Sequence, residues 1–344
     1  MSVLKSTSSV HDVGADKPPF GSRFLTDESQ VWTQNAWDHV PLPDDQTETI
    51  NASLAKQRTA PVPDDDKPRY NEKPARHWDN FYKMNASNFF RNRKWRLHNE
   101  FPELVEATLP EAGPMTIAEL GCGAGNSVFP LLASNKNTHL QLRAYDYSSH
   151  AVKLVQNDEL YISPPAGNIH AAVWDLTSLN GLPTGLEPES VDIVILVFVL
   201  SALHPDEWGR AITNIHRMLK PGGLVVMRDY GRHDLTQLRF KSGRLLDENF
   251  YIRGDKTRVY FFELDELALL FTGHKALLSQ ITDRTSGEYS GVHANLLKPL
   301  AGCSPHPLFT SEQLGVDRRL LVNRKRHLKM YRVWMQGKFR KLAT

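Results

Sequence analysis

Three glycines at alternate positions, Gly121, Gly123 and Gly125, follow an apolar run and a glutamate in the segment TIAELGCGAGN, residues 116–126. Glycine lets the backbone turn sharply out of a strand and approach a ligand that a Cβ atom would push away. A dinucleotide loop would have its third glycine where Asn126 stands, and a P-loop would end in Gly-Lys-Ser or Gly-Lys-Thr. The loop therefore predicts a site for a flat ligand with little phosphate, although a glycine-rich turn can also be purely structural.

Acidic residues stand where further strands are expected to end. Asp146 ends the segment LQLRAYD, and a carboxylate about twenty residues beyond such glycines can accept both ribose hydroxyls of a nucleoside cofactor. Asp175 ends the next apolar segment and is placed to accept from an adenine amine. Each acid alone would also suit a helix cap or a surface position. Together, in this order, they favour a cofactor site, and the pattern of strand and E-x-G-x-G-x-G is similar to that of S-adenosylmethionine-dependent methyltransferases.

The elements that would position these residues alternate between strand and helix. The almost wholly apolar segment 191–200 indicates a central strand that is buried on both faces. Two apolar and basic strands joined by a turn at 323–327 would add an antiparallel hairpin. The sequence therefore predicts an α/β, Rossmann-like, doubly wound and mostly parallel seven-stranded sheet with a C-terminal antiparallel hairpin and an N-terminal helical or extended extension. Other strands are expected at 115–120, 140–146, 170–176 and 224–230, with helices at 126–134, 150–157 and 206–219.

The N-terminal part differs in composition from this alternating region. Residues 1–73 are rich in Pro, Asp, Ser and Thr and lack sustained periodicity, so we expect a largely extended or disordered arm. Two aromatic islands within it, 20–25 and 31–37, suit either docking onto the protein's own surface or stacking on exposed bases. The expected organisation is an arm at 1–73, an aromatic and basic helical segment at 74–110, and a catalytic domain at 111–344 with a surface insertion at about 272–314.

The segment before the glycine loop is crowded with aromatic and basic residues. Trp78 and Tyr82 are four residues apart, so they share one face of the expected helix. Arg91, Arg93 and Lys94 follow, interleaved with further aromatic residues. Such aromatic residues usually belong to a core; here they could instead form a lid over the cofactor with a basic rim for the substrate.

Charge and composition narrow the classes of partner. The chain of 344 residues has a net charge of only +2, yet residues 318–344 contain ten basic side chains and no acidic one. This local basicity indicates either a polyanionic partner or a solvated sheet edge. Two cysteines, Cys122 and Cys303, are too few for a disulfide framework or a zinc site. No metal is expected, no apolar run reaches the length of a membrane span, and no targeting segment is evident, so we expect a cytoplasmic protein.

Several segments together resemble one family, the eukaryotic tRNA 3-methylcytidine methyltransferases. The combination of RDYG and LRFK is specific to it, and 20–40 and 315–340 look more like the branch that modifies threonine tRNAs. The insertion at 272–314 and the spacer at 41–73 depart from the family pattern, which leaves partner contacts open. The matching segments are HWDNFYKMNASNFFRNRKW, ELGCGAGN, ESVDIVILVFVLSALHPD, LKPGGLVVMRDYGRHDLTQLRFK and ENFYIRGDKTRVYFF.

The resemblance implies a reaction, a cofactor and partners. The enzyme would transfer the methyl group of S-adenosylmethionine to N3 of cytidine 32 in the tRNA anticodon loop, leaving S-adenosylhomocysteine. A seryl- or threonyl-tRNA synthetase or another adaptor would be a possible partner beside the tRNA anticodon arm. With Gly123 from the glycine loop, the residues that the resemblance places at the cofactor are Trp78, Tyr82, Gly121, Asp146, Asp175, Leu176 and Val197.

The chemistry of such a reaction suggests which side chains would serve the substrate. N3 of neutral cytosine has a free lone pair, so the barrier should fall through positioning and electrostatics rather than through a general base. The methylated ring is cationic, and Asp229 is the candidate carboxylate beside it, with Tyr230 stacking on the ring. The base must be flipped into a pocket, for which Phe198 and Ser201 are candidate walls.

Basic residues are the candidates for tRNA binding. Arg228 and Arg232 flank Asp229 and could hold a phosphate or the cytosine carbonyl, or form surface ion pairs with Asp229 or Asp234. We expect one positive track for tRNA, formed by Arg91, Arg93, Lys94, Arg318, Arg319 and Arg324. The alternatives are methylation of a protein or a small molecule on the same fold, and an RNA-binding module that uses the cofactor only structurally.

Overall fold

The computed structural model describes residues 23–40, 46–86, 100–276 and 291–343. Its helices are α1 (Gln46–Arg58), α2 (Lys67–Asn71), α3 (Pro74–Asn85), α5 (Pro102–Glu106), α6 (Val128–Ser134), α7 (Ser149–Gln156), α8 (Glu159–Ile162), α9 (Trp208–Met218), α10 (Leu235–Leu238) and α11 (Leu264–Thr272). The strands are β1 (Ala36–Asp38), β2 (Met115–Leu120), β3 (Leu140–Asp146), β4 (Asn168–Val173), β5 (Val191–Val197), β6 (Leu219–Tyr230), β7 (Leu245–Asp247), β8 (Phe250–Ile252), β9 (Arg258–Tyr260), β10 (Phe309–Asn323) and β11 (Leu328–Lys341).

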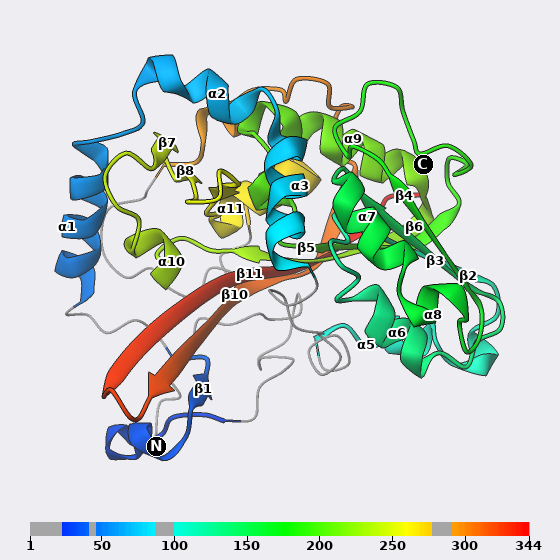
Figure 1. Cartoon of the computed structure of the whole chain (residues 1–344), viewed down its shortest axis with the longest axis horizontal. Helices are drawn as coiled ribbons and strands as arrows, with labels where there is room; N and C mark the ends of the chain where they lie inside the picture. The colour runs from blue at the N-terminus through cyan, green and yellow to red at the C-terminus, as the bar shows by residue number, and fades with distance from the viewer. Residues whose placement is uncertain (1–22, 41–45, 87–99, 277–290, 344) are drawn as a thin grey trace.

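A central sheet organises these elements (Figure 1). Its strand order is β1-β10-β11-β6-β5-β2-β3-β4, with β4, β3, β2, β5 and β6 parallel and the remaining pairs antiparallel. The predicted mostly parallel α/β sheet with its C-terminal antiparallel hairpin is confirmed. The eighth strand, β1, comes from the N-terminal arm and was not predicted.

Side chains alternate between the two faces of β5, which is why this strand reads as a continuous apolar run. Ile193 and Ile195 pack with the core that includes α6 and α7, whereas Val194 and Leu196 pack with the core that includes α9 and α11. A strand buried on both faces favours apolar side chains on either side, and the one charged residue of β5, Asp192, lies near its start and is only partly buried. The sheet is thereby covered by helices on both faces.

The hairpin of β10 and β11 is longer than the sheet to which it belongs. β11 pairs with β6 only over residues 334–340, so the outer half of the hairpin extends beyond the parallel strands (Figure 1). β1 pairs along this outer half, with Trp37 opposite Leu320. Trp37 is 8% exposed and packs with Val31, Leu320, Val322 and Tyr331. Of the two uses considered for this aromatic island, the structure shows docking onto the protein's own surface.

The N-terminal arm is more ordered than its composition predicts. Helices α1 and α2 lie where an extended or disordered chain was expected. The Gln57 side chain donates to the carbonyl of Gln237 at 2.9 Å and accepts from the Tyr251 hydroxyl at 2.8 Å. Helix α1 is thus stabilised by tertiary hydrogen bonds to distant residues, which local periodicity does not reveal.

Of two regions after β6, the first was not predicted and the second differs from the expectation. Strands β7, β8 and β9 form a separate three-stranded antiparallel sheet. In the expected insertion, the described residues 291–309 are not loose, because Leu296, Leu308 and Phe309 are buried and β10 already begins at Phe309. In the described ranges, no helix is both long and apolar enough to span a membrane.

Candidate cofactor and substrate site

A pocket lies at the edge where the carboxyl ends of the parallel strands β4, β3, β2 and β5 meet, as expected for ligand sites in such sheets. All eight residues expected at the cofactor lie in its wall. The lining residues are Trp78, Tyr82, Glu119, Gly121, Cys122, Gly123, Asn126, Asp146, Tyr147, Trp174, Asp175, Leu176, Val197, Phe198, Val199, Ala202 and Leu203.

The glycine loop needs glycine for two reasons. Gly121, Gly123 and Gly125 all have positive φ, at 66°, 54° and 80°, a conformation that disfavours residues with a Cβ atom. A Cβ atom on Gly123 would also collide with the hydroxyl of Tyr82. The side chain of Glu119 accepts from the Val128 amide at 3.1 Å, which fixes the start of α6 after the loop. The backbone of the glycine loop therefore borders the pocket without a Cβ atom at these positions.

Asp146 joins two neighbouring segments of the pocket wall. Its Oδ2 accepts from the Gly123 amide at 2.9 Å and its Oδ1 accepts from the Ser148 amide at 2.8 Å. Burial raises the pKa of Asp146 to about 6, although these two amide hydrogen bonds favour the charged form. The carboxylate is therefore ionised at neutral pH and ready to accept from hydroxyl groups. Asp175, in contrast, is exposed, and its Oδ1 accepts from the amide and the hydroxyl of Thr177, both at 2.8 Å.

Helix α3 supplies the aromatic wall of the pocket. The rings of Trp78 and Tyr82 stack with their centroids 6.0 Å apart, as their spacing of four residues predicts. Tyr82 is 5% exposed and packs in a small cluster with Phe81, Ala124 and Ala151. This cluster places α3 across the glycine loop and the start of α7.

Other pocket residues were not singled out from the sequence. Tyr147 follows Asp146, which ends β3, and Trp174 precedes Asp175. The sequence pattern identified these two neighbouring acids but not the aromatic residues beside them. Cys122 also lines the pocket, and burial raises the pKa of its thiol, which keeps it protonated. Nothing in its type or spacing separated it from a structural cysteine.

The four residues expected at the substrate lie together beside this pocket. Asp229 is the penultimate residue of β6 and accepts from the Ser201 amide at 3.0 Å, and both residues are almost fully buried. Burial raises the pKa of Asp229 to about 6, against hydrogen bonds from Ser201 that lower it. Phe198 lines the pocket, and its ring centroid lies 4.6 Å from that of Tyr230. The guanidinium carbon of Arg253 lies 5.3 Å from the centroid of the Tyr230 ring.

Arg228, expected to bind tRNA, is instead part of the interior. It is 2% exposed, and its guanidinium pairs with Glu100 at 3.2 Å and with Asp317. Successive residues of a strand point to opposite faces, so Arg228 points away from the side that Asp229 occupies. The expectation of a phosphate contact, and the alternative of a surface ion pair with Asp229 or Asp234, are both wrong for this residue.

Arg232 is also buried, at 2% exposed. Its Nη2 pairs with Glu266 at 2.8 Å, and its Nε donates to the carbonyl of Phe261 at 3.3 Å. An arginine in this position fixes the turn after β6 to α11. It cannot reach a tRNA phosphate without breaking a buried ion pair, so the expected role in tRNA binding is wrong.

Most basic residues of the hairpin meet acidic residues, which come from the hairpin itself or from other parts of the chain. Arg319 is 8% exposed and forms ion pairs with Asp38, Glu100 and Asp317 at 3.2–3.3 Å. Arg318 is half-buried. Other pairs are Lys329 with Glu28, Arg332 with Asp234, Lys338 with Glu103, Arg340 with Glu312 and Lys341 with Glu189.

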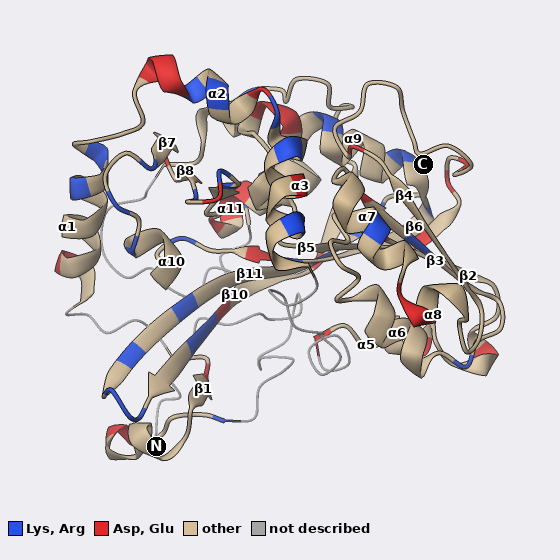
Figure 2. Ribbon diagram, in the orientation of Figure 1, with Lys and Arg blue, Asp and Glu red and all other residues tan. Residues whose placement is uncertain are grey.

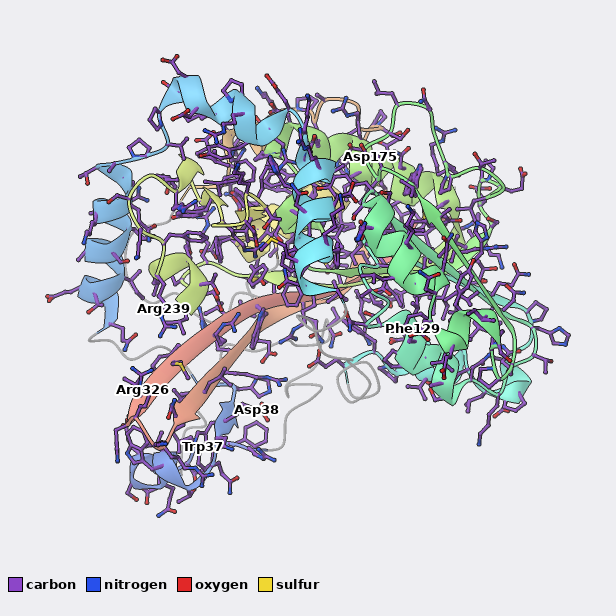
Figure 3. All side chains as sticks on the ribbon, viewed as in Figure 1. Trp37, Asp38, Phe129, Asp175, Arg239 and Arg326 are labelled. Atoms are coloured by element: carbon purple, nitrogen blue, oxygen red, sulfur yellow. The ribbon has the colours of Figure 1, made fainter. Side chains whose placement is uncertain are left out.

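The exposed basic charge of the hairpin is concentrated at its free end. Arg324, Lys325 and Arg326 are exposed in the turn between β10 and β11, which we call the hairpin tip. Figure 2 shows the basic residues along the hairpin, and Figure 3 places Arg326 at its end, far from Asp175. Arg91, Arg93 and Lys94 lie outside the described residues. The expected continuous track is therefore reduced, in the described chain, to this tip.

Comparison with known proteins gives a consistent result. Residues 118–225 match a family model described as a methyltransferase domain. The tRNA N(3)-methylcytidine methyltransferase of Schizosaccharomyces pombe is 42% identical over 98% of this chain and 97% of its own length. The chain belongs to this methyltransferase family. The Drosophila melanogaster member is 39% identical over 98% of this chain and 93% of its own length.

A longer relative carries a more specific name. The Saccharomyces cerevisiae protein named tRNA(Thr) (cytosine(32)-N(3))-methyltransferase is 47% identical over 97% of this chain, which spans only 48% of that protein. S-adenosylmethionine is the cofactor of this methyltransferase family, and the pocket suits it. Carboxylates of Asp146 and Asp175 stand at adjacent strand ends, the glycine loop leaves room for close approach, and acidic groups in the wall match a sulfonium charge. Among the described residues, no group of three His, Cys, Asp or Glu side chains could hold a metal.

Proposed function

We propose that the chain methylates N3 of cytidine 32 in the anticodon loop of threonine tRNAs. The observation that carries the proposal is the position of Phe198, which belongs to the wall of the cofactor pocket and also contacts Tyr230 beside Asp229. A base brought to this corner would face the transferable methyl group. The name of the Saccharomyces cerevisiae relative supports cytidine 32 and the threonine tRNA, and the name of the S. pombe relative supports methylation of N3 of cytidine in tRNA.

Each residue has a role in this proposal. Asp146 and Asp175 would hold the ribose and the adenine, with Trp78, Tyr82 and the glycine loop enclosing them. When bound, S-adenosylmethionine supplies an electrophilic methyl group. The Asp229 carboxylate, fixed by the Ser201 amide, stabilises positive charge that develops on the cytosine ring.

No general base is needed at N3 in this proposal. His204 is the nearest histidine in sequence to the pocket residues Ala202 and Leu203. Burial lowers the pKa of His204, and its Nδ1 accepts from the Asp206 amide at 3.2 Å, where it caps a helical turn. The lone pair of neutral cytosine is sufficient as the nucleophile.

Incubation of the full chain with S-adenosylmethionine and a threonine tRNA transcript is expected to give 3-methylcytidine at position 32. Nucleoside mass spectrometry after site-specific cleavage would measure it, and a transcript with uridine at position 32 is the matched control. If none forms, a threonyl- or seryl-tRNA synthetase, the adaptors of this proposal, is added. A bound cofactor with no 3-methylcytidine even then would contradict the proposal, as would methylation of a protein or a small molecule instead.

We also propose that the hairpin tip contacts tRNA phosphates outside the anticodon loop. Replacing Arg324 and Arg326 with Glu is expected to weaken tRNA binding by about tenfold and to flatten its salt dependence, because fewer counterions are released. Filter binding at several salt concentrations would measure both. Lys136→Glu with Lys153→Glu, two exposed residues on other elements, is the matched control.

Charge reversal at Arg318 and Arg319 would not test tRNA binding cleanly, because Arg319 lies in a buried ion-pair network. Equal weakening by the tip variant and the control variant would contradict a specific role of the tip.

We place the reaction in the cytoplasm, a proposal supported by the two cysteines, which are not joined in a disulfide.

A further inference from the structure

Asp79 connects the aromatic wall of the pocket to the start of α7. It lies on α3 next to Trp78, and its Oδ1 accepts from the Ser148 hydroxyl at 2.7 Å. The same oxygen accepts from the His150 amide at 3.1 Å and from the Ser149 hydroxyl at 3.4 Å. Three donors from one helix start therefore converge on a single oxygen of α3.

These contacts continue to the cofactor site and return to α3. The Ser148 amide donates to Asp146, whose second oxygen accepts from the Gly123 amide. The Tyr82 hydroxyl in turn covers Gly123 so closely that a Cβ atom there would not fit. The ring of contacts passes through Asp79, Ser148, Asp146, Gly123 and Tyr82, and Tyr82 and Asp79 are both on α3.

The other contacts of α3 with this region are apolar. Phe81 and Tyr82 pack against two alanines, Ala124 and Ala151. Burial raises the pKa of Asp79, but the hydrogen bonds from Ser148 and His150 outweigh it and hold the pKa below its usual value. Asp79 is thus ionised at neutral pH, and a charged acceptor forms stronger hydrogen bonds than a neutral one.

We propose that Asp79 is a positioning residue that fastens α3 to the start of α7 and so closes the Trp78 and Tyr82 wall over S-adenosylmethionine. Asp79 does not line the pocket and acts through the helix that carries it. The inference needs cofactor binding at this pocket but not a tRNA substrate. It can therefore fail while the proposed tRNA reaction stands, and the reverse also holds.

The test uses the full chain without tRNA. Asp79→Ala is expected to weaken binding of S-adenosylhomocysteine by about tenfold, measured by titration calorimetry, because a charge-assisted hydrogen-bond cluster is lost. Hydrogen exchange of the amides of residues 74–85 in the free protein should become faster. Asp79→Asn retains an acceptor oxygen without the charge and should recover part of the affinity.

Asp158→Ala is the matched control, because Asp158 accepts from the Leu160 amide at 2.9 Å at the start of α8 and does not line the pocket. It should leave both measurements unchanged. The double variant with Asp79→Ala and Trp78→Ala should lose little more affinity for S-adenosylhomocysteine than either single variant. The reason is that a displaced α3 no longer presents Trp78 to the cofactor.

Three results would overturn the proposal. The first is cofactor binding by a folded Asp79→Ala variant that equals that of the unmodified protein. The second is unchanged exchange of α3 in that variant. The third is an equal loss of affinity in Asp158→Ala, which would show a general effect of removing a helix cap.

Discussion

Asp146→Asn is expected to lower the affinity for S-adenosylmethionine by about a hundredfold while leaving the chain folded at neutral pH. The loss of affinity follows because two hydroxyl groups would then meet a neutral amide, and a charge-assisted hydrogen bond contributes about 1.5–3 kcal/mol. Calorimetric titration at pH 7.5 would measure it. Affinity close to that of the unmodified protein would contradict the ribose-binding role of Asp146.

The stability of the same variant should change little, because two effects oppose each other. Raising the pKa from 3.8 to about 6 means that the buried Asp146 charge costs about 3 kcal/mol of stability at neutral pH. Asparagine removes this cost but replaces one acceptor with an NH2 group, so either Gly123 or Ser148 loses its partner, at about 1–3 kcal/mol. Chemical denaturation would show a difference within about 2 kcal/mol.

The pH dependence has opposite signs for folding and for binding. Because the pKa of Asp146 is raised on folding, its contribution to stability is most favourable below pH 3.8 and is lost as the pH rises to about 6. Cofactor affinity should instead fall as the pH drops through about 6, because the carboxylate takes up a proton. Asp146→Asn should flatten this dependence of affinity, and an unchanged profile would assign the titration to another group.

Asp229→Asn is expected to lower the rate of methyl transfer by about a hundredfold with cofactor affinity unchanged, because a preorganised charge beside the developing cation is removed. Single-turnover measurement of 3-methylcytidine with saturating tRNA would give the rate. The pKa of Asp229 of about 6 further predicts that the rate of the unmodified protein falls below that pH.

A matched acid tests the specificity of this effect. Asp192 lies near the start of β5, at the other end of the strand from Phe198, and pairs with Lys220 at 2.8 Å. Asp192→Asn should leave the rate unchanged. An equal loss of cofactor affinity and rate in Asp229→Asn would contradict a role confined to the transition state.

The sequence was most informative where residues suited to ligand binding follow the ends of expected strands. Gly121, Asp146 and Asp175 could be placed because parallel strands bring their carboxyl ends to one edge. The hairpin could be predicted because its apolar residues recur on both sides of a polar turn. These features depend on local order along the chain, which is what a sequence displays directly.

The roles of the arginines could not be predicted, because their partners are distant in the sequence. Arg228 meets Glu100 and Asp317, and Arg232 meets Glu266, each across the fold. A segment without acidic residues therefore looked like an unpaired basic surface although acids from other segments neutralise it. The alternation of side chains along β6 was the available signal, since neighbours such as Arg228 and Asp229 cannot face the same side.

The pairing of β1 with the outer half of the hairpin sets an order for folding during synthesis. Trp37 pairs opposite Leu320, so the two partners leave the ribosome almost a whole chain apart. The aromatic island at 31–37 therefore remains without its apolar partners while the strands of the central sheet are synthesised. Docking of this N-terminal strand is therefore one of the last steps in forming the native chain, and a message truncated before Phe309 would leave Trp37 exposed to chaperones and to neighbouring chains.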